Sequence, residues 1–230
     1  MKAQAIIVAA GFGVRLKCSQ PKVLVYLQHK PILAYTLEAF EQSTSVKNIV
    51  VVAPKDYLAE FKNIIAQYQI SKVSGIVAGG ATRAESVRSG LKALDKKIDL
   101  VAIHDGARPL VSPRIIEHTI EAAQKYDAAI AAVPVKSTIK SIDSKTMTVK
   151  ETLNRRDLWE IQTPQVFKRE LIIRAHKEVK VDDPSDDAML VEKLGIRIKI
   201  ITGDYKNIKI TTEDDLIIAE AFLTSQGAHI

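Results

Sequence analysis

The hydrophobic positions along the chain form two patterns that alternate from one end to the other. Short, nearly continuous apolar runs are typical of strands that are buried on both faces of a parallel sheet. These runs occupy residues 5–10, 48–53, 72–79, 99–109, 128–135 and 196–202. Between them, apolar residues recur at helical spacing in residues 31–43, 56–68, 83–94, 113–126, 169–179, 186–195 and 212–226. The alternation predicts an α/β fold with a doubly wound, mostly parallel sheet.

Local signals mark where several of the helices begin. Pro31 and Pro113 stand at the first position of a helical pattern, where a proline is favourable because its missing N–H group is not needed. Thr211 or Thr212 is expected to cap the last helix, which has acidic residues in its first turn.

The pattern changes in residues 136–155, where two β-like stretches rich in Thr, Ser and Lys flank "DSKT". This segment has too few apolar residues to join the core, so we expect a hairpin arm that projects from the domain. The chain of 230 residues is 47% hydrophobic, enough for one sizeable core, and residues 1–230 are expected to form a single domain. An isolated hairpin is marginal in water and symmetric dimers are the commonest oligomers, so the arm predicts a homodimer.

Ligands of doubly wound folds bind at the carboxyl ends of the strands, and the opening loop follows the first strand. Gly11 and Gly13 let backbone N–H groups approach an anion, and Arg15 and Lys22 add two cations. The loop lacks the third glycine of a dinucleotide fingerprint and the Gly-Lys-Ser/Thr of a Walker loop. Two cations beside an amide-lined turn suit a triphosphate; the alternative is a structural turn with two solvated basic residues.

Two further stretches follow later strands. In "GGATRAESV" (79–87), paired glycines open a helix whose N-terminal amides are expected to be free, with Ser86 one turn in. The alternative is an ordinary turn and cap. In "HDGARP" (104–109), the strand is expected to end at His104 and Asp105, and Asp105 could hold a substrate hydroxyl or a metal. The alternative is that Asp105 caps a turn and pairs with Arg108, while His104 is a satisfied core histidine.

Three polar stretches in the last third of the chain complete the candidates. Arg155 follows the hairpin, and residues 163–165 (Thr-Pro-Gln) are expected to make a rigid polar turn. Lys209 alternates with isoleucines on a strand-like run and faces either solvent or a cleft. The tetrapeptide "SDDA" begins at Ser185, and Trp159 is expected to pack in the core.

Composition narrows the class of protein. The net charge is +6 and the sequence pI about 9.2, but the basic residues are dispersed among acidic ones, which favours a small polyanionic substrate over nucleic acid. Cys18 is the only cysteine and the five histidines are scattered, so neither a disulfide framework nor a zinc site is expected. The apolar runs are short and no secretory signal is apparent, which predicts a cytoplasmic protein with no membrane span.

Taken in order, "AAGFGVRL", "PK", "GGATRAESV", "HDGARP", "TPQVF", "SDDA" and "NIKIT" make the chain resemble the 2-C-methyl-D-erythritol 4-phosphate cytidylyltransferase family. The resemblance covers residues 4–225. It implies a Rossmann-like nucleotidyltransferase fold, and a reaction that joins CTP to 2-C-methyl-D-erythritol 4-phosphate and gives CDP-methylerythritol and pyrophosphate, in non-mevalonate isoprenoid precursor synthesis. It also implies Mg²⁺ or another divalent cation, with Asp105 the one candidate side-chain ligand.

The resemblance also assigns roles to residues. Arg15, Lys22, Arg155 and Lys209 are implied as catalytic. The implied contacts to the nucleotide are Ala10, Gly11, Gly13, Gly80, Ala81 and Ser86. The implied contacts to the polyol phosphate are Asp105, Arg108, Thr138, Thr163 and Ser185. Thr138 and Arg155 are expected to reach the substrate of the other subunit of a homodimer through the arm.

Other functions remain open at this point. A ribitol-5-phosphate cytidylyltransferase would share almost every phosphate contact, and "PKVL" is closer to sugar-phosphate nucleotidyltransferases such as uridylyltransferases. A non-catalytic nucleotide-binding regulator would be expected to lose Arg15, Lys22 or Lys209, and all three are present. Nucleic-acid binding would show as a steep dependence of affinity on salt.

Overall fold

The computed structural model describes residues 2–13, 16, 18–182 and 184–227. Arg15, one of the cations expected in the opening loop, lies outside the described residues. In the described part of the chain, no helix is both long and apolar enough to cross a bilayer.

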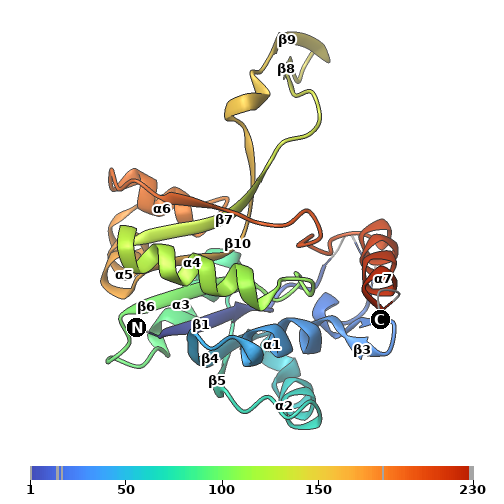
Figure 1. Cartoon of the computed structure of the whole chain (residues 1–230), viewed down its shortest axis with the longest axis vertical. Coiled ribbons are helices and arrows are strands. Elements are labelled where there is room, and N and C mark those ends of the chain that lie inside the picture. The colour runs from blue at the N-terminus through green and yellow to red at the C-terminus, as the bar shows by residue number, and fades with distance from the viewer. Residues whose placement is uncertain (1, 14–15, 17, 183, 228–230) are drawn as a thin grey trace.

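A single sheet forms the centre of the described structure (Figure 1), and its seven strands follow the order β11-β7-β10-β6-β1-β4-β5. The strands are β1 (Ala3–Val8), β4 (Val46–Ala53), β5 (Val73–Ala78), β6 (Leu100–Asp105), β7 (Ala128–Pro134), β10 (Trp159–Lys168) and β11 (Lys199–Thr202). Every pair is parallel except those of β10, which runs antiparallel to both β6 and β7. The predicted doubly wound, mostly parallel sheet is confirmed.

Helices cover both faces of the sheet. One face packs against α1 (Ile32–Gln42), α2 (Leu58–Gln67) and α4 (Pro113–Tyr126), through buried residues such as Phe40, Phe61 and Ile116. The other face packs against α3 (Arg83–Lys92), α5 (Arg169–Glu178) and α6 (Asp187–Lys193). Short 3₁₀ turns occupy Lys22–Leu24, Lys55–Tyr57 and Arg155–Asp157.

The last helix lies apart from these two layers. Helix α7 (Glu213–Gly227) shares a small apolar cluster with the ribbon of β2 (Tyr26–Leu27) and β3 (Lys30–Pro31). Ala219 of the helix and Leu27 of the ribbon are both fully buried in this cluster. The C-terminal segment therefore returns to the ribbon that follows the opening loop (Figure 1).

A hairpin stands out from the body of the molecule, as the pattern at 136–155 predicts (Figure 1). Strands β8 (Lys140–Asp143) and β9 (Thr148–Thr152) pair only with each other in the described structure. Ile142, Met147 and Val149 are 42%, 74% and 60% exposed, so apolar surface is left uncovered on this arm.

Three expectations from the sequence are wrong. Residues 163–165 do not form a turn but lie inside β10, whose ladder with β7 is irregular between Ile161 and Gln165. That irregularity accommodates Pro164, which has no N–H group to donate to a ladder. Trp159 begins β10 at the base of the arm and is 37% exposed instead of packing in the core. The run 207–211 is irregular and not a strand: the amide of Ile210 donates to the carbonyl oxygen of Ala107, in the turn after β6, and not to a strand of the sheet.

The topology creates a crevice at the carboxyl end of the sheet. From β1 the chain moves outward through β4 to β5, and it then returns to β6 on the opposite side of β1. The connections after β1 and β6 therefore diverge, which opens space above these two strand ends. The candidate residues at 10–22, 78–86 and 104–109 all follow strands that end at this edge.

Candidate active site

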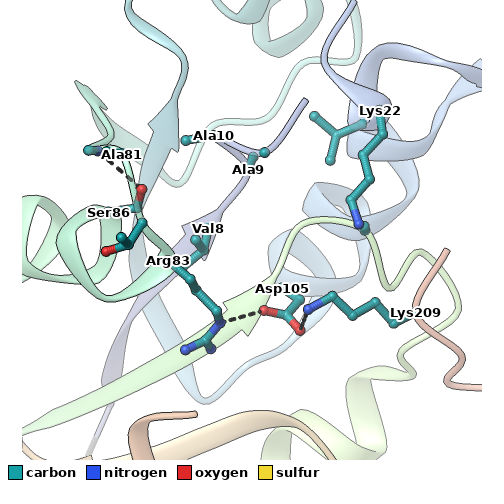
Figure 2. A pocket seen from close by; sticks show the side chains of 14 residues that line it. Val8, Ala9, Ala10, Lys22, Ala81, Arg83, Ser86, Asp105 and Lys209 are labelled. Atoms are coloured by element: carbon teal, nitrogen blue, oxygen red, sulfur yellow. Dashed lines mark hydrogen bonds and ion pairs between the residues drawn. The ribbon is translucent and has the colours of Figure 1, made fainter. Parts of the chain in front are cut away.

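Four of the predicted stretches meet in a cavity of about 180 Å³ at the carboxyl ends of β1, β5 and β6, which we call the glycine-loop cavity. Figure 2 shows Lys22 on one side of it and Ser86 on the other, with Asp105 and Lys209 below. The predicted site residues that line it are Ala10, Gly11, Lys22, Gly80, Ala81, Ser86, Asp105 and Lys209. The structure therefore brings eight of the predicted site residues, from four stretches of the sequence, to one place.

Gly13 shapes the opening loop without lining the cavity. Its φ of +63° lies in the left-handed region, and a Cβ there would stand 2.7 Å from the Cβ of Lys22. A glycine thus lets the loop pass directly against Lys22. The Lys22 ammonium donates to the carbonyl oxygen of Ile210 at 2.9 Å, which holds this cation at the rim of the cavity.

The turn before α3 is packed against the opening loop. A Cβ at Gly79 would lie 2.5 Å from the Cβ of Ala10 and 2.7 Å from the hydroxyl of Ser86, so only a glycine fits without displacement. This close approach fixes the two glycine turns as the facing walls of one cavity.

The amides at the start of α3 are not free, contrary to the expectation from the paired glycines. The amide of Gly80 donates to the Ser86 hydroxyl at 3.2 Å, and the amide of Ala81 donates to the Glu85 carboxylate at 2.7 Å. Thr82 and Glu85 also form a capping box. The spacing of Thr82 and Glu85 is a sequence signature of a capping box, and it could have predicted that the amides before α3 are bonded to side chains of the helix.

Asp105 lies between cations at the end of β6. Arg83 Nε is 3.1 Å from Oδ1, Lys209 Nζ is 2.9 Å from Oδ2, and Arg108 Nε is 3.7 Å from Oδ2. Figure 2 shows Arg83 and Lys209 approaching the carboxylate from opposite sides. Burial alone would raise the pKa of Asp105, but the three cations outweigh it and hold the pKa well below its usual range.

Arg83 is a functional candidate that the sequence reasoning missed. Its Nη1 also donates to Asp187 Oδ2 at 2.8 Å, and Asp187 Oδ1 accepts from His176 Nε2 at 2.9 Å. Burial would raise the pKa of Asp187, but Arg83 and His176 lower it. A positively charged side chain in the first turn of a helix interacts unfavourably with the positive end of the helix dipole. The arginine at that position of "GGATRAESV" therefore indicates that a carboxylate elsewhere in the fold compensates it.

A second cavity of about 250 Å³, which we call the Thr163 cavity, adjoins the first. The two share Arg83, Asp105 and Lys209. Arg108, Thr163 and Ser185, all predicted to contact a phosphorylated polyol, line the Thr163 cavity. Two ligands can therefore lie side by side, separated by one carboxylate and two cations.

His104 is fully buried and contacts Thr163, which lines the Thr163 cavity. Its Nε2 lies 3.3 Å from the carbonyl oxygen of Arg108, so Nε2 must carry a proton and donate it. Nδ1 is then the acceptor for the Thr163 hydroxyl at 3.0 Å, and that hydroxyl accepts from the amide of Asp105 at 3.1 Å. His104 is the satisfied core histidine that the sequence suggested, and it orients Thr163.

Burial lowers the pKa of His104 from 6.5 to about 3, so acid should destabilise the fold. The unfolded chain binds a proton near pH 6.5 that the folded chain excludes until about pH 3. The free energy of unfolding should therefore fall as pH decreases below about 6.5, with His104 contributing about 1.4 kcal/mol per pH unit. Urea unfolding between pH 7 and 4.5 measures this slope.

His104→Gln should reduce the slope by that amount, whereas His118→Gln, on the exposed side of α4, should keep the wild-type slope. Equal slopes in the two variants would show that His104 does not exclude the proton.

Comparison with known proteins identifies the family. Residues 3–225 match the family model described as 2-C-methyl-D-erythritol 4-phosphate cytidylyltransferase. The enzyme of that name from Caldanaerobacter subterraneus subsp. tengcongensis is 45% identical over 226 residues, covering 97% of this chain and 99% of that protein. The one from Halalkalibacterium halodurans is 44% identical and covers 98% and 99%. The chain belongs to the 2-C-methyl-D-erythritol 4-phosphate cytidylyltransferase family.

Solved structures of this cytidylyltransferase family share the fold. The 4-diphosphocytidyl-2C-methyl-D-erythritol synthase from Anaerococcus prevotii superposes with a TM-score of 0.83 at 35% identity, covering 97% of this chain and 96% of that one. The 2-C-methyl-D-erythritol 4-phosphate cytidylyltransferase from Thermus thermophilus superposes with a TM-score of 0.78 at 30% identity, covering 97% and 100%.

Two residues implied by membership of the cytidylyltransferase family are not brought to the cavities. Thr138 and Arg155 lie on the arm, and neither lines the glycine-loop cavity or the Thr163 cavity. Arg155 is exposed and its Nη1 donates to the carbonyl oxygen of Lys136 at 2.8 Å. The site of one chain of this cytidylyltransferase is therefore assembled without them.

Proposed function

We propose that this chain transfers the cytidylyl group of CTP to 2-C-methyl-D-erythritol 4-phosphate, giving CDP-methylerythritol and pyrophosphate for isoprenoid precursor synthesis. The observation that carries the proposal is the pair of cavities that meet at Arg83, Asp105 and Lys209. The glycine-loop cavity, with Lys22 at its rim, suits the nucleotide, and the Thr163 cavity, with Arg108, suits the phosphorylated polyol. Membership of the family supports this polyol over ribitol 5-phosphate.

The reaction requires cations and no general base. The polyol phosphate is largely ionised at pH 7 because its second pKa is about 6. One of its oxygens forms a bond to the α-phosphorus of CTP, and the bond from that phosphorus to the bridging oxygen of pyrophosphate breaks. We propose that Lys209, which lines both cavities, and Lys22, at the rim of the glycine-loop cavity, stabilise negative charge on the α-phosphate and the leaving group.

A magnesium ion in the glycine-loop cavity would find one carboxylate, and both oxygens of that carboxylate already contact cations. Asp105 is the one carboxylate among the described residues that line it. Mg²⁺ is usually held by one or two carboxylates together with substrate phosphates. Within the described ranges, no group of three or more His, Cys, Asp or Glu could hold a metal by itself. We therefore propose that a Mg²⁺ ion would be held mainly by the substrate phosphates, whose charge it would neutralise, with Asp105 as the one described side chain of this cavity that could also bind it.

CTP should be preferred over UTP by at least tenfold in kcat/KM. The amides of Gly80 and Ala81 already donate to side chains of α3, so carbonyl oxygens are the backbone groups left to meet a base there. Carbonyl oxygens accept from the amino group of cytosine and repel the O4 of uracil, a difference of about 1–3 kcal/mol for a buried pair. Pyrophosphate release with each nucleotide measures the ratio, and equal use would contradict a cytosine-specific site.

We further propose that the arm of a second copy completes the site. Ile142, Met147 and Val149 expose apolar surface on the arm, and Trp159 and Ile161 do so at its base. A hairpin of two strands is marginal alone, so this surface needs a partner. A two-fold symmetric dimer would cover this apolar surface and would bring Thr138 and Arg155 to the other subunit's polyol phosphate. The guanidinium of Arg155 can donate two parallel hydrogen bonds to that phosphate.

The cytoplasmic location and the lack of nucleic-acid binding stay predictions of the sequence.

Mixing Lys22→Ala chains with Arg155→Ala chains should restore activity. In a mixed dimer, one site combines the intact Lys22 of one subunit with the intact Arg155 of the other. Random exchange makes about half of the dimers mixed, so about a quarter of the sites should be intact. Pyrophosphate release before and after subunit exchange measures the recovery.

The control mixes Lys22→Ala with Lys209→Ala chains. Both lysines line the same cavity of one chain, so no mixed dimer regains an intact site and activity should stay low. Equal recovery in both mixtures, or none in the first when mixed dimers are shown to form, would contradict shared sites.

A further inference from the structure

A third cavity, which we call the α3–α5 cavity, lies between helices α3 and α5. It has a volume of about 360 Å³ and is lined by the later turns of α3, by α5 and by residues that follow α3. That volume is typical of pockets for small molecules. None of its described lining residues lines the glycine-loop cavity or the Thr163 cavity, so it is separate from the proposed active site.

The walls of the α3–α5 cavity carry one sign of charge. Five lysines and arginines line it, and none of its described lining residues is acidic: Arg88, Lys92, Lys96, Arg169 and Lys177. In the described part of the chain, none of the five forms an ion pair within 4.0 Å. Like charges gathered in a concave surface repel one another and create a positive potential that attracts an anion.

The floor of the α3–α5 cavity is apolar. Leu91 and Leu94 from the α3 side and Ile173 from α5 are its remaining lining residues apart from His176. Leu91 and Leu94 are each 7% exposed and belong to the core cluster beneath this face of the sheet. Aliphatic atoms of a ligand can therefore be removed from water over this floor, while a charged group remains at the cationic rim.

Two buried polar atoms of this wall have no hydrogen-bond partner: Nε of Arg169 and Nδ1 of His176. The His176 side chain is only 3% exposed, and its Nε2 is already bonded to Asp187. Buried polar atoms are normally satisfied, so each unsatisfied one requires an explanation. Because both atoms are buried, a ligand in the cavity would contact the Arg169 guanidinium through its outer nitrogens only.

We propose that the α3–α5 cavity binds a small amphipathic anion, with a phosphate or carboxylate group on the cationic rim and a short aliphatic chain over Leu91, Leu94 and Ile173. The cationic rim would bind the phosphate or carboxylate group, and the apolar floor would contact the aliphatic chain. Each methylene buried on the floor should strengthen binding by about fourfold. The proposal for this cavity does not rest on the proposed cytidylyl transfer.

Hexyl phosphate tests the proposal by calorimetry on the full chain, with CTP present at saturation. Arg169→Gln combined with Lys92→Gln should raise its Kd at least tenfold. The matched control is Arg174→Gln combined with Lys62→Gln, which removes the same number of positive charges from exposed sites on α5 and α2. This control should keep Kd within about twofold of wild type. Inorganic phosphate and hexanol should each bind at least tenfold more weakly than hexyl phosphate.

Resonance mapping on the wild-type chain supplies a readout that does not depend on any variant. Hexyl phosphate should shift the amide signals of Leu91, Ile173 and Lys177, and leave those of Gly80 and Asp105 in place. The proposal is overturned if the two double variants bind hexyl phosphate with equal Kd, or if inorganic phosphate binds as tightly as hexyl phosphate. It is also overturned if the shifted signals centre on Asp105, or if the chain binds phosphatidic acid vesicles but not hexyl phosphate. Pyrophosphate release by the Arg169→Gln, Lys92→Gln variant should match the wild type, which separates this result from the proposed function.

Discussion

Replacing Lys22 with alanine is expected to lower kcat by about 10²–10³ while the chain folds normally and still binds CTP weakly. The Lys22 ammonium is held at the rim of the glycine-loop cavity by the carbonyl oxygen of Ile210 at 2.9 Å. A cation fixed in advance at the place where charge develops stabilises the transition state more than the ground state. The loss of one such preorganised contact typically has this magnitude.

Lys55→Ala is the matched control for this prediction. Lys55, like Lys22, is the first residue of a short 3₁₀ turn, but it is exposed and lines neither of the active-site cavities. Its substitution should change kcat by less than twofold. Steady-state kinetics with CTP and 2-C-methyl-D-erythritol 4-phosphate measure both variants, and a Lys22→Ala kcat within about threefold of wild type would show that Lys22 is not the catalytic cation.

Replacing Asp105 with asparagine is expected to damage both the fold and the activity. The carboxylate is the shared counter-charge of Arg83, Lys209 and Arg108, and it is 6% exposed. Removing one partner from a buried ionic group leaves uncompensated charge and typically costs about 3–5 kcal/mol. Arg83 and Lys209 would also lose the anchor that sets them between the two cavities, so kcat should fall by at least about 10².

Urea unfolding and steady-state kinetics of Asp105→Asn test the two parts separately. Asp56→Asn, at an exposed carboxylate in the turn before α2, should leave both the unfolding midpoint and kcat unchanged. If Asp105→Asn unfolds at the same urea concentration as wild type, the cluster of cations does not depend on this carboxylate, and the account of the site's architecture is wrong.

The hydrophobic pattern predicted those elements whose ends carry local signals. Helix α4 spans Pro113–Tyr126, as predicted, because Ser112 caps it, Pro113 begins it and Asp127 ends it in a left-handed conformation. Strand β10 escaped prediction because three of its inward side chains are polar, and they are buried only because the tertiary fold supplies partners. Gln165, for example, donates to Asp186 at 2.8 Å and accepts from the amide of Ala188 at 3.1 Å.

The site was predictable to the extent that its residues follow strands. Asp105 is the last residue of β6 and the glycine turns follow β1 and β5, so their meeting follows from the topology. Lys209 could not be assigned to solvent or to a cleft, because 207–211 resembles a strand in sequence and only the fold shows that Lys209 contacts Asp105. Arg83 was missed because its two carboxylate partners, Asp105 and Asp187, are distant in sequence.

The most direct test of the central claim is the release of pyrophosphate from CTP with 2-C-methyl-D-erythritol 4-phosphate, each also omitted in turn. The proposed function predicts release only when both substrates are present, with one CDP-methylerythritol formed for each pyrophosphate. Ribitol 5-phosphate in place of the methylerythritol phosphate should give a much lower rate. Release without any polyol phosphate, or equal rates with the two polyol phosphates, would contradict it.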